Sequence, residues 1–176
     1  MQKTIPLLLM ISLSFAACEG EVAMRLPAIS KGAGLLVDIT MRGVPGDGVE
    51  YVGTEPTVGV GTQKSLTVAA GLARALAGGG EGCDLLVRAD RADSPGGVEG
   101  PSAGAAFAVM AYSLFSGEEI KGDATITGGV TQEGKIYSVG GLYEKALSAK
   151  MGGGRAFCHA AAKRGGKAHA AEHKRN

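Results

Sequence analysis

An apolar run behind a Gly-Pro-Ser turn constrains this chain more than any other stretch. Residues 103–115 are apolar at nearly every position and begin with Ala-Gly-Ala-Ala. A helix that is apolar on all sides belongs in a protein interior, so we expect a buried central helix here. Pro101 suits the first helical position, because its φ is already helical and its missing N–H would have had no partner there. The sequence therefore places Ser102 at the N-terminus of a buried helix.

The composition favours close packing of small side chains. The chain has 176 residues, of which 45% are hydrophobic and 5% aromatic, with 30 Gly and no Trp. After a leader, this length suits one domain of about 150 residues. The formal net charge of +1 gives no reason to expect a nucleic-acid partner.

Alternating and helical patterns predict a single α+β domain of α/β-like, mixed character over residues 22–160. The helix that starts at Thr62 should bury Leu66 and Leu76 on one side and end at glycines 78–80. A second helix should span 142–151, and residues 155–159 should form a short last strand. The remaining expected strands are 22–30, 34–42 and 84–89, with a hairpin formed by 123–130 and 135–139. Residues 51–60, which Pro56 interrupts, should form a strand or an extended loop.

The two ends of the chain differ from this domain. Lys3 precedes an apolar run, residues 5–17, that is too short for a comfortable membrane span. Residues 1–18 are therefore predicted to be a secretory signal peptide or a lipoprotein leader with Cys18 as the lipid-bearing residue, and an uncleaved anchor stays open. These interpretations predict an extracytoplasmic protein that is secreted, periplasmic or at the cell surface, with membrane association through the leader or lipidated Cys18. Residues 161–176 are expected to form a basic, disordered tail.

The three cysteines, Cys18, Cys83 and Cys158, have the spacing of no known metal cluster. If Cys18 is lipidated or removed, Cys83 and Cys158 could pair in an oxidising compartment. Two unpaired, buried thiols are an equally good prediction. No metal or cofactor is expected.

Ser102 has two interpretations, a helix cap and a nucleophile. Serine is a common capping residue. As a nucleophile, it would form an oxyanion next to unpaired backbone N–H groups and the positive end of a helix dipole. The reaction then needs a base, and Lys145 could serve once burial makes its amine neutral. All three histidines follow Ser102 and lie near the C-terminus, which disfavours a Ser-His-Asp triad.

Four segments occur in an order that resembles a known family. They are residues 100–104 with Pro-Ser-Ala, 125–128 with Thr-Ile-Thr-Gly, 134–135 with Gly-Lys, and 139–145 ending in Glu-Lys. This order resembles the proteolytic domain of Lon proteases, the serine/lysine-dyad peptidases, clearly over 98–151 and more faintly back to Leu26. The resemblance implies the Lon proteolytic-domain fold, with mixed sheets and packed helices. It also implies unfolded protein or peptide substrates and a homo-oligomeric ring.

The resemblance assigns roles to particular residues. Ser102 would be the nucleophile and Lys145 the base. Thr127 matches the threonine that hydrogen-bonds the catalytic lysine, although threonine also suits an ordinary inward strand position. Glu99 stands where the family has an acidic residue, which would modulate access or the protonation of Lys145 unless it is a plain solvated carboxylate.

The backbone around the serine completes the candidate site. Gly100 allows close approach of the backbone, and the N–H groups around Ser102 and Ala103 are candidates for an oxyanion hole. The pattern of residues 129–135 also has P-loop spacing, but Ile136 stands where Ser or Thr must bind magnesium. Residues 169–173 fit the H-x-x-E-H zinc pattern only at the very end of the sequence. We adopt neither interpretation.

The sequence thus predicts a Lon-like serine endopeptidase with a Ser102–Lys145 dyad. Because the chain has neither the length nor a valid Walker motif for an ATPase module, it would work without ATP or with a separate partner. A non-catalytic Lon-fold module that binds peptides or serves assembly is the main alternative. A different Ser/Lys amidohydrolase or acyl transferase is the third hypothesis.

Overall fold

The computed structural model describes residues 18–53, 57–90 and 97–160. The predicted leader, except Cys18, and the predicted tail lie outside these ranges. The elements in chain order are β1 (Gly20–Ser30), β2 (Ala33–Pro45), β3 (Glu50–Val52), α1 (Val60–Ala77), β4 (Cys83–Asp90), the 3-10 helix η1 (Pro101–Ala103), α2 (Gly104–Ser116), β5 (Ala124–Thr127), β6 (Gly129–Val130), β7 (Ile136–Tyr137), α3 (Leu142–Met151) and β8 (Ala156–His159).

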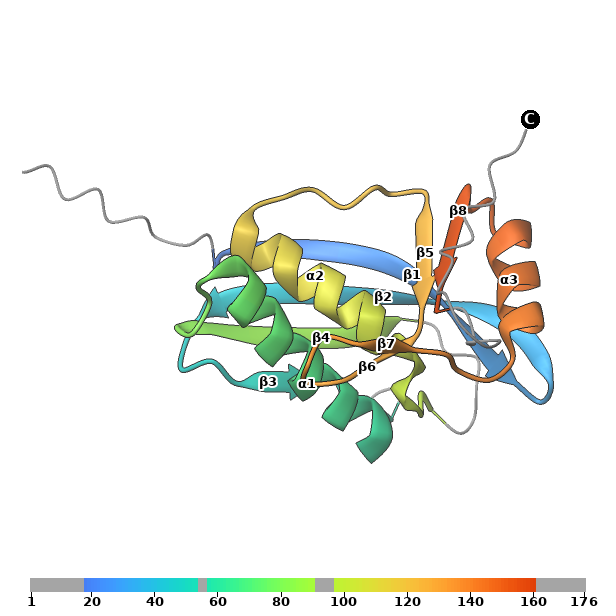
Figure 1. Ribbon diagram of the computed structural model, residues 1–176, viewed down its shortest axis with the longest axis horizontal. Helices are drawn as coiled ribbons and strands as arrows, with labels where there is room; N and C mark the ends of the chain where they lie inside the picture. The colour runs from blue at the N-terminus through green and yellow to red at the C-terminus, as the bar shows by residue number, and fades with distance from the viewer. Residues whose placement is uncertain (1–17, 54–56, 91–96, 161–176) are drawn as a thin grey trace, which may run out of the picture.

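A four-stranded sheet in the order β1-β2-β4-β3 forms the base of the fold. β1 is antiparallel to β2 and β2 to β4, whereas β3 runs parallel to β4. Alternate residues of β2, among them Val37, Ile39 and Met41, are buried. This period of two gives the sheet one apolar face. Helices α1 and α2 lie side by side across the sheet (Figure 1).

The two helices approach closely because small residues line their contact. Ala69, Ala70 and Ala73 of α1 are fully buried. At Gly104 of α2 an added Cβ would lie 2.6 Å from the Ser65 hydroxyl, so only glycine fits there. As predicted, α2 is almost entirely buried, with Val109 as an exposed exception.

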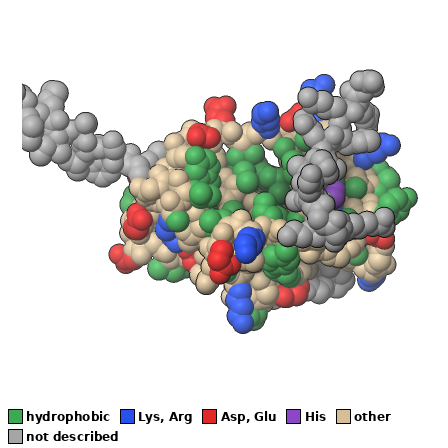
Figure 2. Space-filling model, viewed as in Figure 1, with side chains coloured by type: hydrophobic (Ala, Val, Ile, Leu, Met, Phe, Trp, Pro, Cys, Tyr) green, Lys and Arg blue, Asp and Glu red, His purple; other side chains and the backbone are tan. Residues whose placement is uncertain are grey.

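Part of the predicted burial of α1 is wrong, because Leu76 in its last turn is exposed. Val60, in the first turn of the same helix, is exposed as well. Figure 2 shows apolar side chains lying among charged ones on the face that carries α1 and α2.

The second part of the chain forms two short strand pairs and α3. β5 runs parallel to β8, and β6 is antiparallel to β7. The predicted hairpin therefore forms only at its tip, because residues 124–127 pair with the last strand. Within residues 51–60, predicted as a strand or an extended loop, the strand ends at Val52, and Val58 makes an isolated bridge to Val98. The mixed α+β class predicted from the sequence is confirmed.

The structure matches neither alternative for Cys83 and Cys158, because Cys83 forms a disulfide with Cys18 and Cys158 is free and exposed. The strand register explains the pairing. β1 begins opposite Gly43, near the end of β2, and Cys83 starts β4 opposite Pro45. Both cysteines therefore lie at one end of the sheet. A sulfur in a disulfide cannot also carry a thioether lipid, so the lipidated form of Cys18 and this pairing are mutually exclusive.

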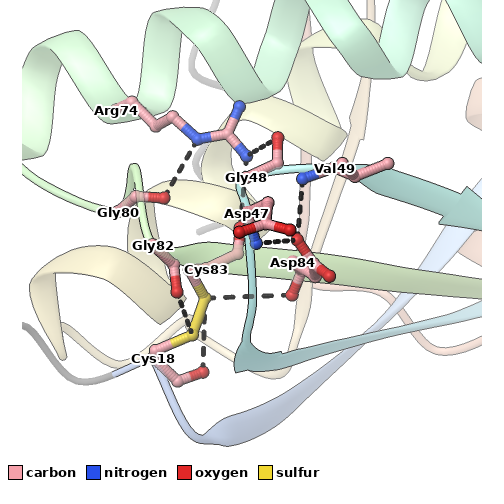
Figure 3. The surroundings of a disulfide bond; sticks show 9 residues. All are labelled: Cys18, Asp47, Gly48, Val49, Arg74, Gly80, Gly82, Cys83 and Asp84. Carbon is pink, nitrogen blue, oxygen red and sulfur yellow. Dashed lines mark hydrogen bonds between the residues drawn. A yellow bond between two sulfur atoms is a disulfide. The ribbon is translucent and has the colours of Figure 1, made fainter.

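An arginine next to this disulfide ties α1 to the end of the sheet (Figure 3). Arg74 donates to the carbonyl oxygens of Gly80 and Gly48 at 3.1 and 2.9 Å, and it forms a 2.8 Å ion pair with Glu50. Asp84 accepts two backbone N–H groups of the turn between β2 and β3. None of the helices in the described ranges combines the length and the apolar character that crossing a membrane requires.

Candidate active site

Ser102 lies in a tight turn in front of the buried helix. Gly100 has a φ of 112°, a conformation that favours glycine, and it is the N-cap of η1. Pro101 takes the first helical position, as predicted. The single turn of 3-10 helix then leads directly into α2. Ser102, which is half-buried, therefore occupies the predicted helix N-terminus.

Lys145 reaches the same region from α3. Lys145 is only 4% exposed, and its Nζ donates to Thr127 Oγ1 at 3.3 Å. Burial lowers the pKa of Lys145 below the usual lysine value of 10.5, because desolvation disfavours the charged amine. The neutral form, which a general base requires, is therefore more accessible at Lys145 than at an exposed lysine.

Thr127 connects the serine turn to the lysine. Its hydroxyl donates to the carbonyl oxygen of Ser102 at 3.2 Å and accepts from Lys145 Nζ at 3.3 Å. The N–H of Gly128 reaches the same Ser102 oxygen at 2.9 Å. Because the single hydroxyl proton of Thr127 goes to Ser102, its oxygen can only accept from the lysine. This leaves the lone pair of a neutral Lys145 amine free for another proton.

Ser102 and Lys145 line one cavity of about 180 Å³. The other predicted site residues on its wall are Glu99, Gly100 and Ala103. Apolar side chains of β1, β2 and β4 also line this cavity. Within the described part of the chain, no hydrogen bond joins Ser102 Oγ to Lys145 Nζ, whose side-chain partner is Thr127. The structure thus brings the two residues to one cavity with the lysine held by threonine.

Glu99 is exposed at the cavity wall, and its carboxylate has a backbone partner that the sequence did not predict. Its Oε1 accepts the backbone N–H of Gly61 at 3.0 Å, in the first turn of α1. The N-cap of that helix, Gly59, has no side chain to cap it. A Cβ at either glycine would collide with the Glu99 carboxylate. Glu99 therefore caps α1 from the serine loop, an anion at the positive end of a helix.

Sequence reasoning missed two further residues at this site. The hydroxyls of Thr62 and Ser65 on α1 donate to carbonyl oxygens of the serine turn. Both are buried on a helix face that is otherwise lined with Leu and Ala. Polar residues three apart on such a face were the available signal.

Comparison with known proteins agrees with this geometry. Residues 93–158 match the model of the Lon protease (S16) C-terminal proteolytic domain. They therefore resemble the Lon proteolytic domain. The match includes Ser102, Thr127 and Lys145, and it confirms the resemblance predicted from the sequence.

Curated Lon proteases match parts of the same chain. The Lon protease of Erwinia amylovora is 34% identical over 125 residues, which cover 68% of this chain and 16% of that protein. Lon protease 2 of Syntrophobacter fumaroxidans is 46% identical over 55 residues, 31% of this chain and 7% of the relative. A mitochondrial Lon protease homolog of Candida albicans is 44% identical over 62 residues, which cover 34% of this chain and 6% of that protein. The chain thus spans a sixth or less of these Lon proteases.

Of the two other motifs found in the sequence, only residues 129–135 lie in the described part of the chain. Residues 129–135 run through β6 and the turn before β7, where Thr131 N–H donates to Lys135 O, so they do not form a loop between a strand and a helix. The pattern at 169–173 lies outside the described residues. In the described ranges, no group of three or more His, Cys, Asp or Glu side chains is arranged to hold a metal ion.

Proposed function

We propose that this chain is a Lon-like serine endopeptidase in which Ser102 is the nucleophile and Lys145 its base. One observation carries the proposal. The backbone of Ser102 and the buried amine of Lys145 are hydrogen-bonded to the same hydroxyl, that of Thr127, at the wall of one cavity.

The proposed reaction follows from which groups at this site can donate a proton and which can accept one. A turn of the Ser102 side chain brings its hydroxyl to the free lone pair of neutral Lys145, which takes the proton as Oγ attacks the peptide carbonyl carbon. The carbonyl oxygen becomes an oxyanion, and the Ser102 N–H, without an intrahelical acceptor in the first turn, is a donor for it. Lys145 then returns the proton to the leaving amine. Water hydrolyses the acyl-enzyme, with Lys145 as base again.

The proposal includes peptide or unfolded protein substrates, because the cavity beside Ser102 is lined mainly by apolar residues. It also includes hydrolysis without ATP, or with an ATPase on a separate chain, and assembly into a ring like that of Lon proteases. Each of these is tested on the purified protein, by fluorescent peptide cleavage with and without ATP and by its mass in solution.

An extracytoplasmic location forms part of the same proposal. The Cys18–Cys83 disulfide supports it, because such bonds persist in oxidising compartments and are rare in the cytosol. The apolar run at residues 5–17 is consistent with export.

Mass-spectrometric mapping of a fluorophosphonate or peptide-boronate adduct tests the nucleophile. We expect the adduct on Ser102, and we expect Ser102→Ala and Lys145→Met to abolish both labelling and peptide hydrolysis. Matched controls come from the same two helical regions. Ser116→Ala at the exposed end of α2 and Lys150→Met on the exposed side of α3 should retain both. Undiminished cleavage by Ser102→Ala or Lys145→Met contradicts the proposed dyad.

A non-catalytic peptide-binding or assembly module is the second candidate. It is favoured by the absence, in the described structure, of a hydrogen bond between Ser102 Oγ and Lys145 Nζ. Such a module binds peptides without releasing fragments, and its Ser102 stays unlabelled by the acylating probe. A screen of esters and amides alongside peptides separates endopeptidase activity from other Ser/Lys hydrolase or acyl-transfer chemistry.

A further inference from the structure

The carbonyl oxygens of the serine turn are bound by hydroxyl groups of neighbouring elements. Thr62 Oγ1 donates to Gly100 O at 3.1 Å, with Val98 O as a second acceptor at 3.4 Å, and Ser65 Oγ donates to Pro101 O at 3.3 Å. Thr127 Oγ1 donates to the next oxygen, that of Ser102. Three successive carbonyl groups are therefore fixed by side chains from outside the turn.

Two of these hydroxyls belong to the same face of α1. Thr62 and Ser65 are three residues apart in the helix and are 2% and 7% exposed. Burying a hydroxyl on an apolar face is unfavourable unless it is hydrogen-bonded. Both hydroxyls donate to carbonyls outside α1, in residues 98–101, and not to carbonyls of the helix itself.

Fixing a carbonyl also fixes the N–H across the same peptide bond. In a trans peptide the C=O and N–H point in opposite directions. When Ser65 holds Pro101 O against α1, the N–H of Ser102 is directed away from α1. Ser102, Gly100 and Ala103 all line the cavity. The Ser102 N–H is also the donor that the mechanism uses for the oxyanion.

We propose that Thr62 and Ser65 are positioning residues that orient the oxyanion donor of Ser102. This inference rests on the proposed function, since an oxyanion arises only if Ser102 attacks a carbonyl. Ser65 and the backbone N–H of Gly104 both donate to Pro101 O, and together they hold the peptide plane between Pro101 and Ser102. Thr62 holds the carbonyl of Gly100, which belongs to the preceding peptide group, and so orients the chain as it enters Pro101.

The test compares variants that lose a hydroxyl with variants that keep it or lose one elsewhere. Ser65→Ala and Thr62→Val remove the two donors, and Thr62→Ser restores one. Thr67→Val is the matched control, because Thr67 is exposed on the same helix and donates only to Gln63 O within α1. We measure kcat and KM for a peptide, and the affinity for the peptide boronate, whose tetrahedral anionic adduct occupies the oxyanion position.

For Ser65→Ala and Thr62→Val we expect kcat and boronate affinity to fall by about tenfold or more, since a slightly misplaced donor stabilises the oxyanion less. KM should stay within about twofold, because the substrate's ground-state contacts are unchanged. Thr62→Ser and Thr67→Val should behave like wild type. Thermal unfolding shows which variants fold, and if Ser65→Ala does not, the comparison of Thr62→Val with Thr62→Ser decides.

The outcomes separate this inference from the proposed function. A wild-type protein that neither hydrolyses peptides nor reacts at Ser102 overturns the proposed function and this inference together. An active wild type whose Thr62→Val and Ser65→Ala variants match Thr67→Val in kcat and boronate affinity overturns the inference alone. Equal losses in kcat and in affinity for an unreactive peptide also overturn it, because they indicate a general structural role.

Discussion

Reducing the Cys18–Cys83 disulfide should lower the free energy of unfolding by about 4 kcal/mol. The bond joins residues with a sequence separation of 65. In the chain-entropy description, closing a loop of this length removes about 14 cal/mol/K from the unfolded chain, which is about 4 kcal/mol at about 25 °C. The total stability of a domain is about 5–15 kcal/mol, so the loss is a large fraction of it.

Urea unfolding followed by far-ultraviolet circular dichroism measures this change. Oxidised wild type is compared with reduced wild type and with Cys18→Ser, whose remaining thiol, Cys83, stays buried. Cys158→Ser is the control, because Cys158 is free and exposed. We expect reduced wild type and Cys18→Ser to unfold at the same lower urea concentration. Their dependence on urea should be steeper, because an unfolded chain without the cross-link exposes more surface.

Mass spectrometry after alkylation shows whether the bond is present or broken in each sample. If it is broken and neither the unfolding midpoint nor the slope moves, the argument from chain entropy is refuted. If protein exported to an oxidising compartment has all three thiols free, the Cys18–Cys83 pairing itself is refuted.

Three further predictions concern the site. Burial lowers the pKa of Lys145 below 10.5, so the unfolded chain takes up a proton at Lys145 at a higher pH than the folded chain does. The free energy of unfolding of the wild type should therefore decrease as the pH falls from 10.5 toward the lowered pKa, whereas Lys145→Met should show no such decrease. Urea unfolding measures the difference in unfolding free energy between the two proteins, and a difference that stays constant with pH would contradict a lowered pKa at Lys145. Thr127→Val removes both hydroxyl hydrogen bonds, so we expect a loss of about 1–2 kcal/mol in the free energy of unfolding and a fall of about tenfold or more in kcat, checked by urea unfolding and peptide cleavage. Glu99→Ala should cost about 1 kcal/mol of stability as a lost helix cap, and the pH profile of kcat/KM should keep its midpoint, whereas a shifted midpoint would indicate that Glu99 acts on Lys145.

The sequence was sufficient for the local features of the site. Pro101 and the apolar run behind it predicted a helix N-terminus at Ser102, because both effects depend on neighbouring residues only. The order of short motifs singled out Thr127 and Lys145, and the structure places both at the cavity of Ser102 or hydrogen-bonded to it. Their catalytic roles stay predictions for the experiments above.

The contacts that sequence reasoning missed all join residues far apart in the chain. Glu99 caps α1 because the serine loop passes the helix start, and no pattern near Glu99 indicates that partner. Likewise β5 pairs with β8 across α3 and the intervening β6–β7 hairpin, so the local alternation that predicted a longer hairpin identified a strand but not its neighbour. A strand's period of two specifies which face is buried and leaves the partner open.

By itself, the sequence determined that this is a mixed α+β chain with a serine at the N-terminus of a buried helix, since periodicity, proline and small residues act over a few positions. Only the tertiary structure decided which cysteines pair, what Glu99 binds, and that Thr62 and Ser65 hold the serine turn. Those outcomes depend on strand register and on the approach of α1 to α2, which are set by packing the whole core at once.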